Sequence, residues 1–95
     1  MYTVKLLLRA ELEVNEACEW YEKRKPGLGG KFLEEFDHCI NRIANHSLHY
    51  AVNFSEKYRF ALLKVFPYSV VYRFDDENSI LVISVFHQHR NPIDF

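Results

Sequence analysis

Hydrophobic and polar residues alternate at the start of the chain and again through its second half, which is the period of a β-strand. Five segments show this alternation or a continuous apolar run: Tyr2–Leu8, Tyr50–Phe54, Tyr58–Phe66, Tyr68–Phe74 and Ile80–Phe86. The last of them is apolar at odd and even positions alike, so both of its faces should be covered. We therefore expect Ile80–Phe86 to be an interior strand of a sheet.

Between the first two strands, apolar residues recur every three or four positions, which predicts amphipathic helices over Ala10–Arg24 and Lys31–Asn45. The intervening Lys25–Gly30 contains a proline and three glycines, which is typical of a tight turn. Helices joined by so short a turn pair antiparallel as a hairpin. The order β–α–α–β–β–β–β predicts an α+β fold, with the hairpin on one face of an antiparallel-rich sheet of four to five strands. We expect residues 1–95 to form one domain.

The alternation also assigns side chains to the two faces of the predicted sheet. Phe60, Leu62, Val70 and Tyr72 are expected beneath the helices. The opposite face would then carry aliphatic residues and two arginines: Arg59, Ala61, Leu63, Val65, Val71 and Arg73. An exposed apolar patch rimmed by arginine suits a segment of another protein, added as a strand at the sheet edge or laid as a helix in a groove.

Composition and charge narrow the class of protein. The chain is 48% hydrophobic and 26% charged, a globular profile, and its formal net charge is −1 with a sequence pI of about 6.5. Nucleic-acid binding relies on an excess of lysine and arginine, so this balance counts against such a partner. No apolar run is long enough to cross a bilayer. The chain starts directly in a strand pattern that includes Lys5, so we expect no secretory signal and a cytoplasmic location.

The residues that most often carry chemistry have structural interpretations here. Cys18 and Cys39 fall on the inward stripes of the two predicted helices, where apolar surroundings raise a thiol pKa and favour packing over catalysis. His87 and His89 alternate at a strand end, but a metal site needs further ligands, so no metal is expected. The sequence has no glycine-rich phosphate loop, so no cofactor is expected. We expect His87 to hydrogen-bond within the domain or to contact a partner. Trp20, at the edge of a helix stripe, either covers the core or anchors an interface.

Four short motifs, taken in order, resemble the RelE/ParE toxin superfamily and its ParE branch in particular. They are "EWYE" (Glu19–Glu22), "GLGGKF" (Gly27–Phe32), "FPYSVVYRF" (Phe66–Phe74) and "VFHQHRNP" (Val85–Pro92). Each motif is weak alone, but the set has the right order and spacing and spans essentially the whole chain. The resemblance implies the toxin of a type II toxin–antitoxin system, of the plasmid-stabilisation kind, held inactive by a cognate antitoxin. Both a homodimer and a hetero-oligomer with the antitoxin remain open.

The superfamily divides by target: RelE-like members cut messenger RNA on the ribosome, whereas ParE-like members inhibit DNA gyrase by protein binding. Metal-independent RNA cleavage needs an acid or base and cations around the reacting phosphate. At the positions aligned with the RelE-like site, this chain has Arg59, Ala61, Ser69 and Gln88. With one basic residue among these four, the sequence favours gyrase inhibition. The alternatives are an endoribonuclease that uses Arg59, His87, His89 and Arg90, and an inert antitoxin-binding homologue.

The partner surface predicted from these patterns comprises Trp20, Arg59, Ala61, Leu63, Val71, Arg73 and Arg90. Its last member opens the tail Arg90–Phe95, in which Pro92 favours an extended backbone. We expect Ile93 or Phe95 to pack back on the domain. His87 and Arg90 would then flank the patch around Arg59.

Overall fold

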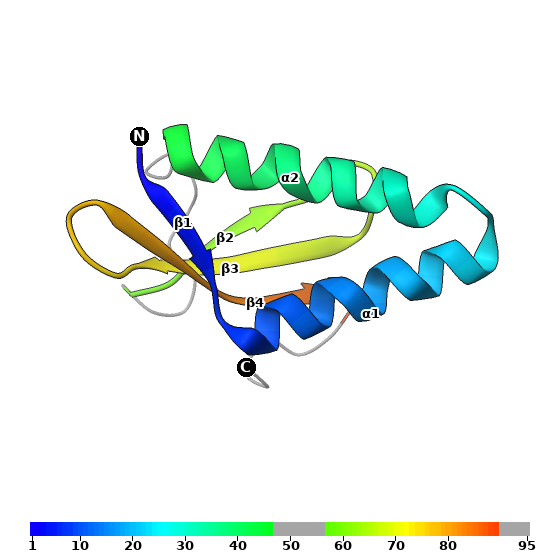
Figure 1. Cartoon of the computed structure of the whole chain (residues 1–95). Helices are drawn as coiled ribbons and strands as arrows, with labels where there is room; N and C mark the ends of the chain where they lie inside the picture. Colours follow the sequence, from blue (N-terminus) through cyan, green and yellow to red (C-terminus); the bar gives the residue numbers. More distant parts are fainter. Residues whose placement is uncertain (47–56, 90–95) are drawn as a thin grey trace.

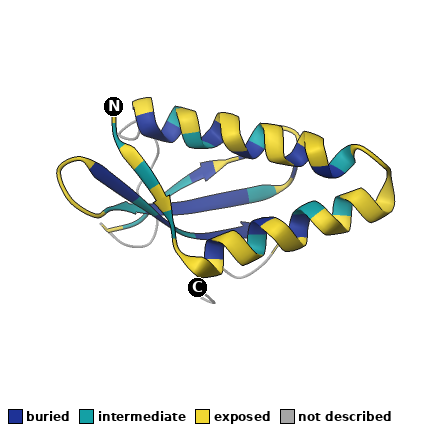
Figure 2. Cartoon of the chain, in the orientation of Figure 1, coloured by how far each residue is buried: buried dark blue, intermediate teal, exposed yellow. Residues whose placement is uncertain are grey.

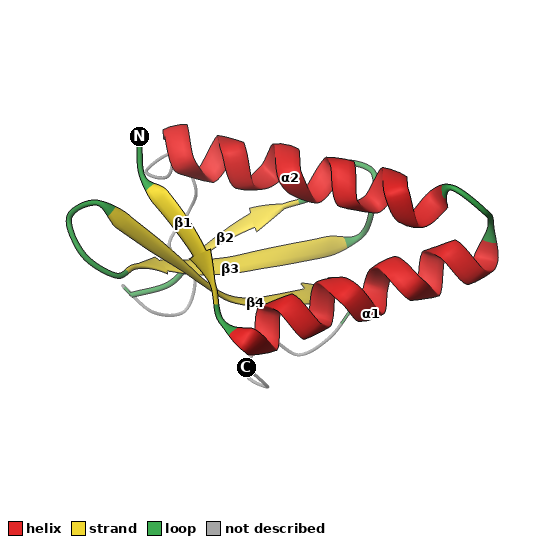
Figure 3. Cartoon of the chain, viewed as in Figure 1, coloured by secondary structure: helices red, strands yellow, loops and turns green. Residues whose placement is uncertain are grey.

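The computed structural model places a helical hairpin on one face of a four-stranded sheet (Figures 1 and 3), and it describes residues 1–46 and 57–89. The elements are β1 (Thr3–Leu6), α1 (Leu8–Arg24), α2 (Leu28–His46), β2 (Arg59–Leu62), β3 (Tyr68–Phe74) and β4 (Ser79–His87). The predicted α+β fold is confirmed. The strand predicted over Tyr50–Phe54 lies outside the described residues.

The sheet has the strand order β1-β4-β3-β2, with β1 parallel to β4 and the other neighbours antiparallel. The strand predicted to be interior, β4, therefore lies between β1 and β3. Its two neighbours differ in length. β1 pairs with β4 only as far as Leu6↔Val82, whereas β3 pairs with it to Tyr68↔His87, past a register shift opposite Val71 and Tyr72. Among the strands that the structure describes, only β3 therefore pairs with the last part of β4.

The helical hairpin closes more tightly than the sequence predicts, because α2 begins at Leu28 and takes in two glycines that were expected in the turn. A Cβ atom at Gly29 would lie 2.7 Å from the Cys18 carbonyl oxygen, so glycine permits the close approach of the helices. Gly27 turns the chain with φ of 91°. The Glu22 carboxylate accepts hydrogen bonds from the Gly27 and Gly29 N–H groups, both at 3.0 Å, and so satisfies donors that the start of α2 leaves unpaired.

The core lies between the hairpin and the sheet (Figure 2). An aromatic cluster fills the end nearest the hairpin turn, where Tyr21 contacts Phe66 with ring centroids 4.7 Å apart and Phe32 contacts Tyr68 at 5.2 Å. Cys39 is fully buried among these layers, and burial raises the pKa of its thiol to about 11. Cys18 is half-buried and bonds no partner sulfur. The inward packing predicted for the buried thiol is thus confirmed.

The predicted faces are correct for β3 but wrong for β2. Val70 and Tyr72 are fully buried under the helices, as expected, but their partners across the strand pair are Ala61 and Arg59. Residues directly opposite each other share a face, so Ala61 and Arg59 belong to the helix-facing side. Leu62, predicted to be buried, is instead 56% exposed.

The wrong prediction has a physical cause. Phe60 and Leu62 are apolar, but so are Ala61 and Leu63, so hydrophobicity does not indicate which pair faces the helices. The turn chooses. The Leu63 N–H donates to the Tyr68 carbonyl at 3.0 Å, and the Val65 N–H donates to the Glu35 carboxylate of α2 at 2.8 Å. This segment therefore leaves the strand at Leu62, four residues before the predicted end at Phe66.

The predicted apolar patch is divided as a result. Ala61 and Leu63 are buried beneath the helices, whereas Val71 and Arg73 lie on the other face of the sheet. Val65 is exposed in the turn rather than on a strand.

Candidate functional site

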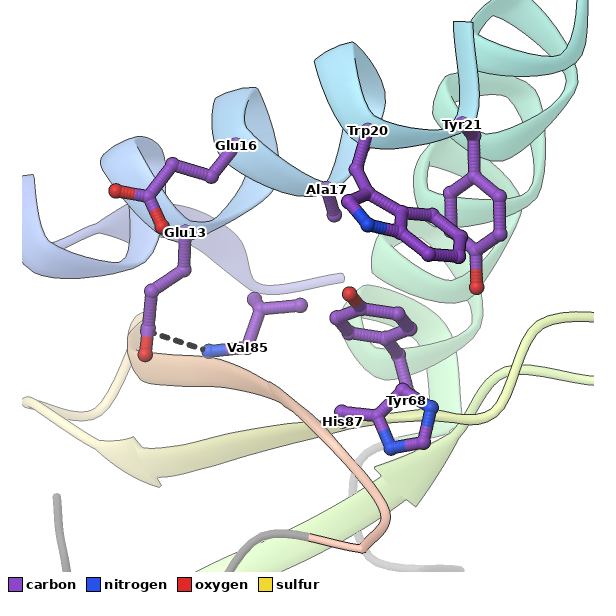
Figure 4. A pocket seen from close by; sticks show the side chains of 8 residues that line it. All are labelled: Glu13, Glu16, Ala17, Trp20, Tyr21, Tyr68, Val85 and His87. Atoms are coloured by element: carbon purple, nitrogen blue, oxygen red, sulfur yellow. Dashed lines mark hydrogen bonds between the residues drawn. The ribbon is translucent and has the colours of Figure 1, made fainter. Parts of the chain in front are cut away.

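A pocket of about 340 Å³ opens between α1 and the end of β4, at the edge that β1 does not reach (Figure 4). Its walls come from three elements. The lining residues are Glu13, Glu16, Ala17, Trp20 and Tyr21 of α1, Tyr68 of β3, and Val85 and His87 of β4. The hollow combines apolar and aromatic walls with converging carboxylate and imidazole groups, which is typical of a binding site, so this is the candidate site.

Helical spacing explains the α1 wall. Positions three and four apart lie on one flank of a helix, so Glu13, Glu16, Ala17 and Trp20 line up along the side of α1 that faces the strand edge. Ala17 is buried and small, which leaves space beneath the helix. The flank carries carboxylates at one end and an aromatic ring at the other (Figure 4).

Glu13 closes one end of the pocket. Its carboxylate accepts hydrogen bonds from the Ser84 hydroxyl at 2.8 Å and the Val85 N–H at 2.9 Å, and lies 3.6 Å from the Arg9 guanidinium. The side chain of Glu13 is only 13% exposed. Because the bonded N–H belongs to the strand edge, Glu13 takes the position of an acceptor that a neighbouring strand would supply.

The opposite end of the pocket is aromatic. Tyr68 meets the imidazole of His87 edge to face, with ring centroids 5.4 Å apart, and His87 in turn stacks on His89 at 5.0 Å. The His89 N–H donates to Nδ1 of His87 at 3.2 Å, which leaves Nε2 as the nitrogen that can carry the proton of the neutral ring. His87 therefore has one nitrogen committed to the chain.

Trp20 forms the outer rim and is 50% exposed. The Arg24 guanidinium, one turn further along α1, lies 4.2 Å from the centre of the indole ring. Tyr21 contacts the same indole edge to face at 5.0 Å. The indole is held by two neighbours and still offers surface to a partner, so its predicted role as an interface anchor stays a prediction.

Of the sequence-predicted site residues that the structure describes, Trp20 and His87 line this pocket. Arg59 lies across the sheet, with its guanidinium 5.9 Å from the ring of Phe74. Ala61 and Leu63 lie in the core, whereas Val71 and Arg73 lie on the far face of the sheet. Arg90, Ile93 and Phe95 lie outside the described residues, so the predictions made for them are not addressed.

Six of the eight lining residues were not predicted from the sequence, and Glu13, Glu16 and Tyr68 are the ones whose chemistry matters most here. Glu13 and Glu16 look like the solvated face of an amphipathic helix, and Tyr68 looks like one more core aromatic of a strand. Glu13 and Glu16 could have been found from their helical spacing with Trp20, because that spacing puts two carboxylates and an exposed aromatic ring on one flank of the helix.

The positions aligned with a RelE-like nuclease site do not converge. Ala61 is fully buried on the helix-facing side with Arg59, whereas Ser69 pairs with Leu62 on the opposite side of the sheet. Gln88 donates from its side-chain amide to the Tyr68 carbonyl at 3.3 Å. These four residues therefore do not form one cationic site.

Within residues 1–46 and 57–89, no cluster of three or more His, Cys, Asp or Glu side chains is placed to hold a metal ion. No helix in those ranges is both long and apolar enough to span a bilayer.

The profile of the family described as ParE toxin of type II toxin-antitoxin system, parDE, matches residues 4–92. No curated protein matches the sequence significantly.

Several solved structures share the fold. A chain of the chromosomal ParDE TA system from P. aeruginosa superposes with a TM-score of 0.77 at 17% identity, covering 92% of this chain and 96% of that one. A chain of the intact E. coli RelBE toxin-antitoxin complex gives 0.70 at 19% identity, with coverage of 95% and 100%. The isolated E. coli RelE toxin gives 0.70 at 18% identity, with coverage of 99% and 92%.

Proposed function

This chain belongs to the ParE toxin family of type II toxin–antitoxin systems, and we propose that it arrests growth by binding DNA gyrase and is neutralised by a cognate antitoxin. The proposal has two parts, the partner that restrains the toxin and the target that it inhibits. Each rests on a different observation and has its own test.

An antitoxin partner is supported by the structural relatives. One similar chain comes from a ParDE TA system and another from an intact RelBE toxin-antitoxin complex. The present chain has the same fold over most of its length. Its half-exposed Trp20 and the pocket beside it supply the kind of aromatic, concave surface at which protein interfaces concentrate binding energy.

Gyrase binding, rather than RNA cleavage, is supported by the placement of Ala61, which is the observation that carries this part. Cleavage of RNA needs cations and a proton-transfer group gathered around one phosphate. A fully buried methyl group replaces one of those positions, and Ser69 points to the other face of the sheet. The net charge of −1 also provides little attraction for RNA.

Expression in cells tests the proposal. The chain is induced alone, and in parallel with the reading frame that neighbours its gene. Induction alone should arrest growth and switch on a DNA-damage reporter while cellular mRNA stays intact, and co-expression of the antitoxin should restore growth. Cleavage of mRNA on ribosomes, without a DNA-damage response, would replace gyrase inhibition with the endoribonuclease alternative. Normal growth under full expression would indicate an inert homologue.

A further inference from the structure

The end of β4 presents backbone groups that no strand among residues 1–46 and 57–89 uses. Pairing with β1 stops at Leu6↔Val82, but β4 runs on to His87. In an antiparallel pair, hydrogen-bonded and non-bonded partners alternate. The Gln88 N–H donates to the Pro67 carbonyl at 2.8 Å, so in this register the N–H groups of Val85 and His87 point away from β3. They point toward the pocket.

Only one of these two amides is bonded by a described side chain. Glu13 accepts from Val85, as described above. The His87 N–H has no acceptor among residues 1–46 and 57–89. The pocket is therefore bounded by a short strand edge, at which Glu13 satisfies the Val85 amide and no described residue satisfies the His87 amide.

The side chains of the pocket have an equally definite chemistry. The Glu16 carboxylate is exposed and forms no hydrogen bond or ion pair with any described residue. The rings of Trp20 and Tyr68 line the other end of the same pocket (Figure 4). A long cationic side chain suits this combination, because its methylene stem can pack on the rings while its charged head reaches the carboxylate.

We propose that this pocket receives an extended segment of the antitoxin, which adds to the free edge of β4 and inserts an arginine or lysine between Trp20 and Glu16. Its backbone accepts a hydrogen bond from the His87 N–H and donates one to the Val85 carbonyl. The inference rests on the proposed antitoxin partner and specifies where and by what chemistry that partner binds.

The shape of the site selects this occupant over a second copy of the chain. The part of the β4 edge that no described strand covers is short, 85–87, and lies beneath the flank of α1. A folded copy would have to bring a whole sheet edge, with its packed helices, into this recess. A single extended chain needs only the width of one strand, about 5 Å.

Charge reversal tests the side-chain part of the inference. The antitoxin encoded beside the chain is titrated calorimetrically into wild-type protein, the Glu16→Arg variant and the Glu19→Arg variant. Glu19 makes the matched control, because it lies on the same helix, is exposed, and does not line the pocket. Glu16→Arg should weaken binding about tenfold or more through like-charge repulsion, and Glu19→Arg should change it less than about twofold. Equal effects of the two variants would overturn the assignment of the pocket.

Amide exchange tests the backbone part. In the free protein the His87 amide should exchange faster than that of Gln88, which is bonded to Pro67. Addition of the antitoxin should slow the His87 amide at least about tenfold and change that of Gln88 much less. An unprotected His87 amide in a saturated complex would overturn strand addition. If wild-type protein binds no antitoxin, the proposed function is wrong. If it binds the antitoxin, but Glu16→Arg has no effect and the His87 amide is not protected, only this inference is wrong. A complex of two copies without antitoxin, protected at His87, would reassign the site to self-association.

Discussion

The carboxylate of Glu13, in the first helix, holds the backbone N–H of Val85, in the last strand, at 2.9 Å. The two residues are 72 positions apart in the sequence. Their contact joins the helical hairpin to β4 just beyond the end of its pairing with β1, and it forms one boundary of the pocket. The same bond therefore contributes to stability and shapes the surface that we assign to the antitoxin.

Removal of that carboxylate should be costly. Glu13→Ala leaves the Ser84 hydroxyl and the Val85 N–H without their acceptor in a largely buried position. A buried polar group left unsatisfied costs about 1–3 kcal/mol, so urea denaturation should show a loss of stability in this range. Glu16→Ala serves as the control, because its exposed carboxylate bonds no described residue, and its effect should stay within about 0.5 kcal/mol. Equal stability of the two variants would mean that the Glu13 bonds contribute nothing.

Two neighbouring glycines of α2 should respond in opposite directions to the same change. In Gly29→Ala the new methyl group would meet the Cys18 carbonyl at 2.7 Å, so the helices must separate. Overpacking of this kind costs about 1–3 kcal/mol. At Gly30 a Cβ atom meets nothing within 4 Å, so Gly30→Ala should raise stability by up to about 1 kcal/mol through helix propensity. Thermal unfolding of both variants checks the pair, and a stabilised Gly29→Ala protein would contradict the close approach of the helices.

The buried thiol of Cys39 should make stability fall at alkaline pH. Its folded pKa is raised to about 11, whereas in the unfolded chain a cysteine ionises near pH 8.5. Between these values the unfolded state has lost the proton and the folded state keeps it, so unfolding becomes more favourable as the pH rises. The loss should approach about 1.4 kcal/mol per pH unit within this window, and stability below pH 8 should be unaffected by this group.

The comparison that isolates this effect is with Cys39→Ala, which lowers stability at every pH but removes the thiol. The difference in unfolding free energy between wild type and variant should shrink from pH 8 to pH 11. A difference that is constant over the whole range would show that Cys39 ionises equally in both states.

Trp20 should matter for binding more than for folding. Its indole is half-exposed on the pocket rim, so Trp20→Ala should weaken antitoxin binding by about 2 kcal/mol, as at an interface hot spot. Leu33→Ala is the control, because Leu33 is an exposed apolar residue of the other helix and does not line the pocket. Calorimetric dissociation constants compare the two, and equal effects would remove Trp20 from the interface.

Much of the fold could be predicted from the sequence because its signals are periodic. The two helices, the hairpin between them and the interior position of Ile80–Phe86 follow from spacing and from the apolar run. The faces of β2 could not be predicted in this way. Phe60 and Leu62 compete with Ala61 and Leu63. The alternation is set by turn hydrogen bonds that the Tyr68 carbonyl and the Glu35 carboxylate accept, and no local pattern encodes these bonds.

The pocket could not be predicted from the sequence for a related reason. It exists because β1 stops at Leu6 while β4 continues to His87, and because α1 passes over the remainder. Strand lengths and the partner of each edge are properties of the assembled sheet. Trp20 could be singled out from its type and position, whereas Glu13 acquires its role only when Val85 is beside it.

The central claim, that this ParE-family toxin acts by binding gyrase, is tested most directly by a supercoiling assay with purified components. Relaxed plasmid, gyrase and ATP are incubated with increasing amounts of the chain, and again with the chain saturated by its antitoxin. We predict that supercoiling stops with the chain alone and recovers fully when the antitoxin is present. Undiminished supercoiling at a large excess of chain that still binds the antitoxin would contradict gyrase as the target.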